Sequence, residues 1–80
     1  AVKFGDRNAD VKILQEYLIA KKYLGLGYNT GYYYNLTAKA VLKWQLDNLV
    51  AFDRYGYSED ELRVLSGKYF GKVSLKVMHS

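Results

Sequence analysis

The chain has 80 residues, half of them apolar, and twelve Lys and Arg against eight Asp and Glu give it a net charge of +4. This length allows one domain at most, and the apolar content excludes the disordered class. Cysteine is absent, which excludes a disulfide framework and a thiolate metal site. No stretch approaches the roughly 20 apolar residues that span a bilayer, and no signal peptide is visible. The positive charge is spread along the chain, unlike the dense basic stripe of nucleic-acid modules, and favours a polyanionic partner.

The first predicted helix runs from Asn8 to Leu24. Asn8 or Asp10 is expected to cap its start, because a side-chain oxygen there accepts from the free backbone N–H groups of the first turn. Gly25 and Gly27 follow the helix and are expected to end it. Its apolar residues recur at intervals of three and four and form one stripe, made of Val11, Leu14 and Leu18 and widened by Ile13 and Tyr17.

The second predicted helix begins at Asn35 or Thr37, either of which is a suitable cap, and ends at Asn48. Trp44 lies at the edge of its apolar face and is expected in the core. That face is shared by Ala38, Val41, Leu42, Gln45 and Leu49.

A third, shorter helix is predicted to begin at Ser58. Glu61 follows three residues later, which is the spacing of a capping box, in which each side chain satisfies the other residue's backbone N–H. Leu62 and Leu65 are its expected core residues, and Gly67 is expected to close it.

Both ends of the chain predict strands. Val2 and Phe4 alternate with Lys3, and apolar residues alternate with polar ones over Lys72–Met78. A lone strand leaves its backbone groups unpaired, so the second segment needs a partner. That partner is either Val2–Phe4 or a sheet edge on another chain.

One helical phrase occurs twice, as D-V-K-I-L-Q at residues 10–15 and as A-V-L-K-W-Q at residues 40–45. A tyrosine-rich turn punctuated by glycines lies between the copies. Apolar coincidences are common between amphipathic helices, but Gln15 and Gln45 also take the same place on the inner face. A glutamine at a buried edge usually hydrogen-bonds the backbone of a neighbouring loop, so we expect a structural role for both.

These residues resemble a known family. The run from Gly5 to Leu18, G-D-R-N-A-D-V-K-I-L-Q-E-Y-L, is similar to G-x-x-G-x-D-V-x-x-L-Q-x-x-L, the opening of the three-helix type of peptidoglycan-binding domain found in bacterial cell-wall hydrolases and surface proteins. The run T-G-Y-Y-Y-N-L-T-A-K-A-V-L-K-W-Q at residues 30–45 resembles the family's G-x-[YF]-G-P-x-T-x-x-A-V-x-x-[FW]-Q. The resemblance covers about Phe4 to Leu65. It implies a mainly α fold, a small three-helix bundle with long turns.

The expected organisation is a three-helix peptidoglycan-binding-like domain over residues 1–66 and a C-terminal extension over residues 67–80 that forms a strand. A short terminal β pairing would join Val2–Phe4 to Lys72–Met78. Gly67–Ser80 lies outside the family pattern altogether.

The chain departs from the family near the expected ligand. Tyr34-Asn35 stands where the family has Gly-Pro, and the chain contains no proline. The family's D-G-x-x-G-P-x-T turn appears only loosely, as D-R-Y-G-Y-S at residues 53–58. The resemblance therefore supports the fold better than the ligand.

The tyrosines are the first candidate for ligand binding, and Tyr32, Tyr33 and Tyr34 stand in a row with Tyr28 close before them. An aromatic ring offers an apolar face to a sugar ring and a hydroxyl to its hydroxyl groups. At least one of three consecutive tyrosines must face inward. Two alternatives stay open, because aromatics also stabilise small cores without disulfides and tyrosine is common at protein–protein interfaces.

Asp53, Arg54 and Tyr55, on the turn before the third helix, are the second candidate. A carboxylate and a guanidinium there suit a muramyl peptide, since Arg matches the shape of a terminal carboxylate. The alternative is an ordinary solvated turn.

No catalytic cluster can be assembled from the sequence. The three carboxylates at residues 59–61 lie in a helix's first turn, where they complement the helix dipole. His79, the only histidine, is next to the end of the chain. We therefore expect a protein that is not an enzyme and uses neither metal nor cofactor.

The sequence thus predicts a binding module that anchors to bacterial cell-wall peptidoglycan through the tyrosine-rich turn and adjacent groove. It is expected outside the cell or on the cell wall, without membrane insertion or nucleic-acid binding. The alternative is a structural subunit of a surface filament or phage particle, which would self-associate through the C-terminal strand.

Overall fold

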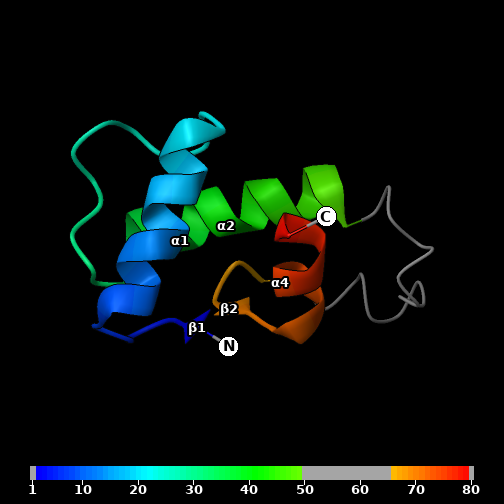
Figure 1. The fold of residues 1–80 in the computed structure, drawn as a ribbon, viewed down its shortest axis with the longest axis horizontal. Coiled ribbons are helices and arrows are strands. Elements are labelled where there is room, and N and C mark those ends of the chain that lie inside the picture. The colour runs from blue at the N-terminus through cyan, green and yellow to red at the C-terminus, as the bar shows by residue number, and fades with distance from the viewer. Residues whose placement is uncertain (1, 50–65, 80) are drawn as a thin grey trace.

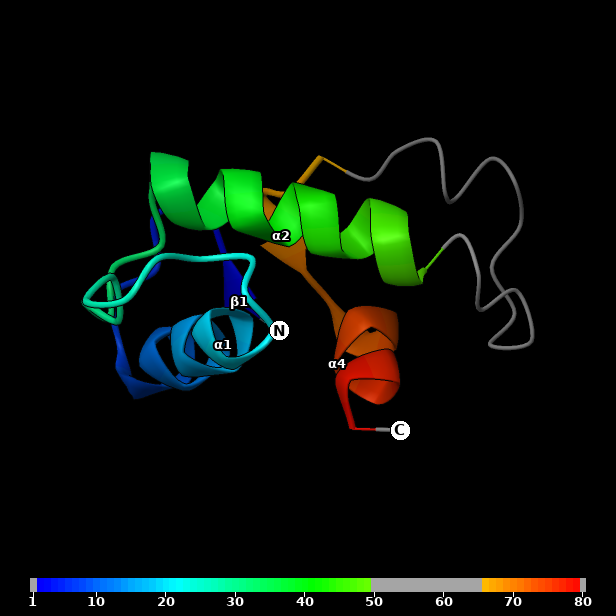
Figure 2. The same ribbon diagram turned by 90° about the horizontal axis from the view of Figure 1, so that it is seen from above.

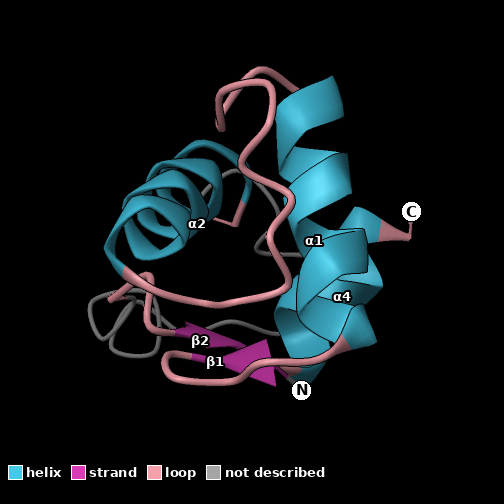
Figure 3. Ribbon diagram, turned by 90° about the vertical axis from the view of Figure 1, so that its left-hand side faces the viewer, coloured by secondary structure: helices cyan, strands magenta, loops and turns pink. Residues whose placement is uncertain are grey.

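The computed structural model describes residues 2–49 and 66–79. Their elements are, in chain order, β1 (Val2–Lys3), α1 (Ala9–Ala20), α2 (Asn35–Asn48), β2 (Tyr69–Phe70) and α4 (Lys72–Met78). Helix α2 runs across α1 and α4, which stand on one side of it, and the two strands lie at the base of the helices (Figure 1, Figure 2 and Figure 3). This mainly helical architecture with one small sheet confirms the predicted fold class. The third helix predicted from Ser58 falls outside the described residues.

Helix α1 begins as predicted and ends earlier. The side chain of Asn8 accepts a hydrogen bond from the backbone N–H of Val11 at 3.0 Å, which confirms it as the cap. The helix stops at Ala20 rather than Leu24, because Lys22 takes a positive φ of 67° that helical backbone cannot have. The chain then turns back, and the N–H of Tyr23 donates to the carbonyl of Leu18 at 2.8 Å.

Helix α2 has the predicted ends but not the predicted cap. Tyr34 occupies the cap position, and its side chain makes no capping hydrogen bond. Asn35 is already the first helical residue, and Thr37 is the third. The hydroxyl of Thr37 accepts a hydrogen bond from the side chain of Gln15 instead. The hydroxyl that was expected to cap α2 thus forms a tertiary contact with α1.

The strand expected at Lys72–Met78 is wrong, because this segment is helix α4. Ser74 and Val77 are its buried residues, and a spacing of three puts them on one face of a helix, whereas in a strand they would point to opposite faces. The terminal pairing does exist, two residues earlier in the chain. Val2 lies opposite Phe70 and Lys3 opposite Tyr69 in an antiparallel register.

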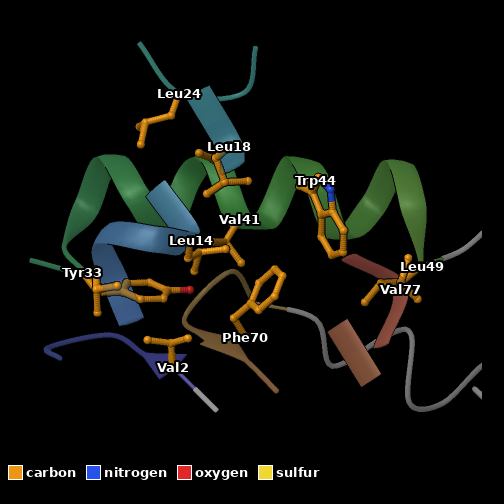
Figure 4. Packing of buried hydrophobic residues seen from close by; sticks show 12 residues of the cluster. Val2, Leu14, Leu18, Leu24, Tyr33, Val41, Trp44, Leu49, Phe70 and Val77 are labelled. Carbon is orange, nitrogen blue, oxygen red and sulfur yellow. The ribbon is translucent and has the colours of Figure 1, made fainter. Parts of the chain in front are cut away.

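Trp44 lies in the core, as predicted, with 1 % of its surface exposed. Its ring packs against that of Phe70 at 5.1 Å between centroids (Figure 4). Phe70 and Val77 are buried in the same cluster as the residues of α1 and α2. The segment expected as an extension beyond residue 66 therefore supplies part of the core.

Gln15 holds the tyrosine-rich turn against α1. Its Oε1 accepts from the N–H of Gly31 at 2.7 Å, and its Nε2 donates to the carbonyl of Tyr32 at 3.0 Å and to the hydroxyl of Thr37 at 2.9 Å. The side chain is 1 % exposed, so these bonds form away from water. We call this set of bonds the first glutamine clamp.

Gln45 forms a second clamp of the same kind on the segment before α4. Its Oε1 accepts from the N–H of Gly67 at 3.2 Å, and its Nε2 donates to the carbonyl of Tyr69 at 2.7 Å and to the hydroxyl of Ser74 at 3.4 Å. The predicted structural role of both glutamines is confirmed.

The two clamped segments are built alike. Each has a glycine N–H on the glutamine oxygen, a hydroxyl at the third residue of the following helix (Thr37 and Ser74), and a fully buried ring two residues before that helix (Tyr33 and Phe70). The repeated helical phrase thus marks two helices, α1 and α2, whose glutamines hold the segments that lead into α2 and α4.

Replacing Gln15 or Gln45 with Leu should lower the free energy of unfolding by about 2–4 kcal/mol. Leucine keeps most of the volume but leaves a glycine N–H and a buried hydroxyl without partners, at about 1–3 kcal/mol for each unsatisfied group. Chemical denaturation measures the effect, with Lys12→Leu on the exposed side of α1 as the matched control. A loss below about 1 kcal/mol for both glutamine variants would refute the role of the clamps.

A second test compares two glycines that both have positive φ. Gly67, at φ +75°, would place a new Cβ against the Ala38 carbonyl oxygen and 2.6 Å from the Cβ of Leu42. Gly27, at φ +90°, has open space around the same position. Gly27→Ala should cost only the backbone strain, about 1–2 kcal/mol, whereas Gly67→Ala should cost clearly more and unfold much of the protein. Equal melting temperatures for the two variants would contradict this packing.

Candidate functional site

The tyrosine-rich turn is fixed to the segment before α1 by backbone hydrogen bonds. The N–H of Asn8 donates to Gly31 at 3.0 Å, the N–H of Tyr33 donates to Asp6 at 2.9 Å, and the N–H of Gly5 donates to Tyr33 at 2.8 Å. The turn is extended here, and successive side chains of an extended segment point to opposite sides. Tyr33 therefore points inward, and its two neighbours point outward.

Tyr33 is fully buried, so the expectation that it contacts a ligand is wrong. Its hydroxyl donates to the carbonyl of Gly67, and its ring lies among the core residues (Figure 4). Burial, with a smaller contribution from the charge of Asp6, raises the pKa of Tyr33 well above its ordinary value. This bond joins the turn held by the first glutamine clamp to the segment held by the second.

Tyr32 and Tyr34 form an aromatic stack on the outer side of the turn. Their ring centroids are 5.3 Å apart with the planes 13° from parallel, and Phe4 follows at 5.2 Å from Tyr34. A cation stands at each end, because the guanidinium of Arg7 lies 4.5 Å from the Tyr32 centroid and the ammonium of Lys68 lies 5.4 Å from that of Phe4. We call these three rings the aromatic ladder.

The ladder already engages part of the ring surface of its tyrosines. Both Arg7 and Tyr34 contact the ring of Tyr32, and Tyr34 also packs against Phe4. Both tyrosines still line a groove beside the ladder, and Tyr34 is 49 % exposed. The expectation that Tyr32 and Tyr34 contact a ligand stays a prediction.

A groove of ≈ 370 Å³ lies beside the ladder, and we call it the tyrosine groove. Tyr28 is 47 % exposed and Leu36 is 52 % exposed, so the groove offers apolar surface as well as hydroxyl groups. Its lining consists of Tyr28, Thr30, Tyr32, Tyr34, Asn35, Leu36 and Thr37.

A second hollow of ≈ 240 Å³ adjoins this groove and shares Tyr28 and Leu36 with it. Lys39 and Lys43 lie on its α2 side, and we call it the lysine hollow. The remaining lining comes from Tyr23, Leu24, Gly25 and Ala40.

The other predicted site residues, Asp53, Arg54 and Tyr55, lie outside the described residues. Within residues 2–49 and 66–79, no group of three or more His, Cys, Asp or Glu side chains is arranged to hold a metal ion. None of the helices that the structure describes is long and apolar enough to cross a membrane.

Residues missed by sequence reasoning complete the site. Phe4 and Arg7 lie near the start of the chain and Lys68 lies more than 60 residues later, and only the fold brings these residues together with Tyr32 and Tyr34. One signal was available, because Tyr32 and Tyr34 are two residues apart and an extended segment puts such residues on the same side.

Comparison with protein families places this site in a known context. A family model described as "Putative peptidoglycan binding domain" matches residues 7–53, more than half of the chain. The chain belongs to this peptidoglycan-binding domain family. The matched region contains Arg7, α1, the tyrosine-rich turn and α2, so both the tyrosine groove and the lysine hollow lie within it. Comparisons with curated proteins and with solved structures found no match.

Replacing Tyr33 with Phe tests the bond that joins the two clamped segments. At neutral pH the variant should lose about 1–3 kcal/mol of unfolding free energy, because the Gly67 carbonyl loses its donor. The raised pKa of Tyr33 adds a pH dependence: its contribution is complete below pH 10.0, the ordinary tyrosine value, and is lost as the pH rises above it.

Wild-type stability should therefore fall above that pH more steeply than the stability of Tyr33→Phe, by up to about 1.4 kcal/mol per pH unit. Tyr23, whose pKa is raised by burial and by its hydrogen bond to Asp47, is present in both proteins and cancels. Denaturation curves between pH 8 and 11 measure the difference, with the exposed Tyr28→Phe as control. Parallel curves for wild type and Tyr33→Phe would contradict the assignment.

Proposed function

We propose that this chain is a non-catalytic module that anchors to bacterial cell-wall peptidoglycan through the tyrosine groove. The observation that carries the proposal is the position of the groove, which is open, partly apolar and lies within the region matched by the peptidoglycan-binding family. The proposed location is the cell wall or the cell exterior.

The proposed contacts follow from what the groove leaves exposed. Tyr28 and Leu36 offer apolar surface to a sugar ring or an N-acetyl methyl group, while the hydroxyl groups of Tyr32 and Tyr34 and the amide of Asn35 offer hydrogen bonds. The net charge of +4 assists association with a wall rich in carboxylates. The turn itself is held by Gln15, so little ordering should be needed on binding.

The alternative of a filament or virion subunit has lost its main support. It rested on an unpaired strand at Lys72–Met78, and that segment is a helix that packs into the protein's own core. We therefore do not propose self-association through this segment.

Sedimentation with purified sacculi at low salt tests the proposal. Wild-type protein should be retained, and Tyr28→Ala or Leu36→Ala should weaken retention about tenfold, the loss expected for one well-placed contact of about 1.4 kcal/mol. Leu26→Ala is the matched control, because Leu26 is 89 % exposed and lies outside the groove. Folded wild-type protein that fails to sediment with sacculi would refute the function.

A further inference from the structure

The exposed side of α2 joins two surfaces of different chemistry. Leu36 lies where the tyrosine groove meets the lysine hollow, and Lys39 and Lys43 follow it at successive turns of the helix. The opposite wall is shared as well, because Tyr28 lines both depressions. We call the two adjoining depressions together the channel; its lining is apolar and hydroxylated in the tyrosine groove and carries two lysines in the lysine hollow.

The two lysines are available to a ligand. Both are exposed, and neither ammonium group forms an ion pair within the described part of the chain. Asp47, one turn beyond Lys43, accepts a hydrogen bond from the hydroxyl of Tyr23 at 2.9 Å.

The channel has the length of a short peptide. Leu36 and Lys43 are separated by seven residues of α2, which is about 10 Å along the axis at ~1.5 Å per residue. An extended peptide covers the same distance in about three residues at ~3.3 Å each. A ligand with a sugar at one end and a carboxylate about three residues away would therefore reach both ends.

We propose that the lysine hollow binds the free carboxylates of the peptidoglycan stem peptide while the attached sugar lies in the tyrosine groove. This inference rests on the proposed function and assigns a part of the ligand to Lys39 and Lys43. A peptide is favoured over a phosphate polymer because the hollow has only two cations on its wall and opens directly into apolar surface. A polyanion such as teichoic acid would be matched by a longer run of positive charge.

The test uses two soluble disaccharide–tetrapeptide fragments of peptidoglycan that differ only in whether the stem carboxylates are free or amidated. Wild-type protein should bind the free form about fivefold more tightly by calorimetry, the effect expected of two exposed charge pairs. The variant Lys39→Gln/Lys43→Gln should lose this preference and bind both forms like the amidated one.

The matched control is Lys3→Gln/Lys72→Gln, which lowers the net charge equally at two exposed lysines outside the channel and should keep the preference. Equal binding of the two fragments by wild type would overturn the inference and leave the proposed function standing. An equal loss in both double variants would also overturn it, since general attraction would then explain the binding. Wild type that binds neither fragment nor sacculi would refute the proposed function itself.

Discussion

The constraint on which this structure depends is the satisfaction of backbone groups by two buried glutamine side chains. Each clamp pairs an amide oxygen with a glycine N–H and an amide nitrogen with a carbonyl and a hydroxyl, and both glutamine side chains are buried. A glutamine can do this because its side chain carries both donor and acceptor at one end. A buried polar group without a partner is costly, so the pairing fixes where each turn must lie. Turns that would otherwise vary are thereby held in place in a chain of only 80 residues.

The two clamps act on one connected structure. Tyr33 emerges from the turn held by Gln15 and donates its hydroxyl proton to Gly67, whose N–H is held by Gln45. Helix α2 takes part in both, because Thr37 near its start belongs to the first clamp and Gln45 near its end makes the second. The short pairing of β1 with β2 brings the beginning and the end of the described chain to the same edge. The same contacts therefore stabilise the packing of the core and fix the position of the tyrosine-rich turn.

The surface proposed to bind follows from this internal arrangement. With Tyr33 fixed inward, the alternation of an extended segment sends Tyr32 and Tyr34 outward, where Arg7 and Phe4 complete the ladder. Tyr32 and Tyr34 thus pack within the ladder through one part of their surface and line the groove with another part. The exposed surfaces of Tyr28 and Leu36 are the apolar part of the groove that is proposed to bind the ligand. The family relationship gives the class of ligand, and the groove gives its proposed place.

The sequence by itself determined the start of α1, the extent of α2, most of their buried positions and the family, because helical periodicity and the two motifs are local properties of the chain. It also identified Gln15 and Gln45 as a pair. It was wrong about Ile13, which was expected in the apolar stripe of α1 and is 58 % exposed. It was wrong at Lys72–Met78, where seven residues fit both a period of two and a spacing of three, and only packing of Ser74 and Val77 into the core distinguishes them. Tertiary structure alone decided which tyrosine is buried, which hydroxyl becomes a clamp rather than a cap, and which distant cations flank the rings. The physical reason is that these outcomes depend on contacts between residues far apart in the sequence, and local sequence patterns do not specify such contacts.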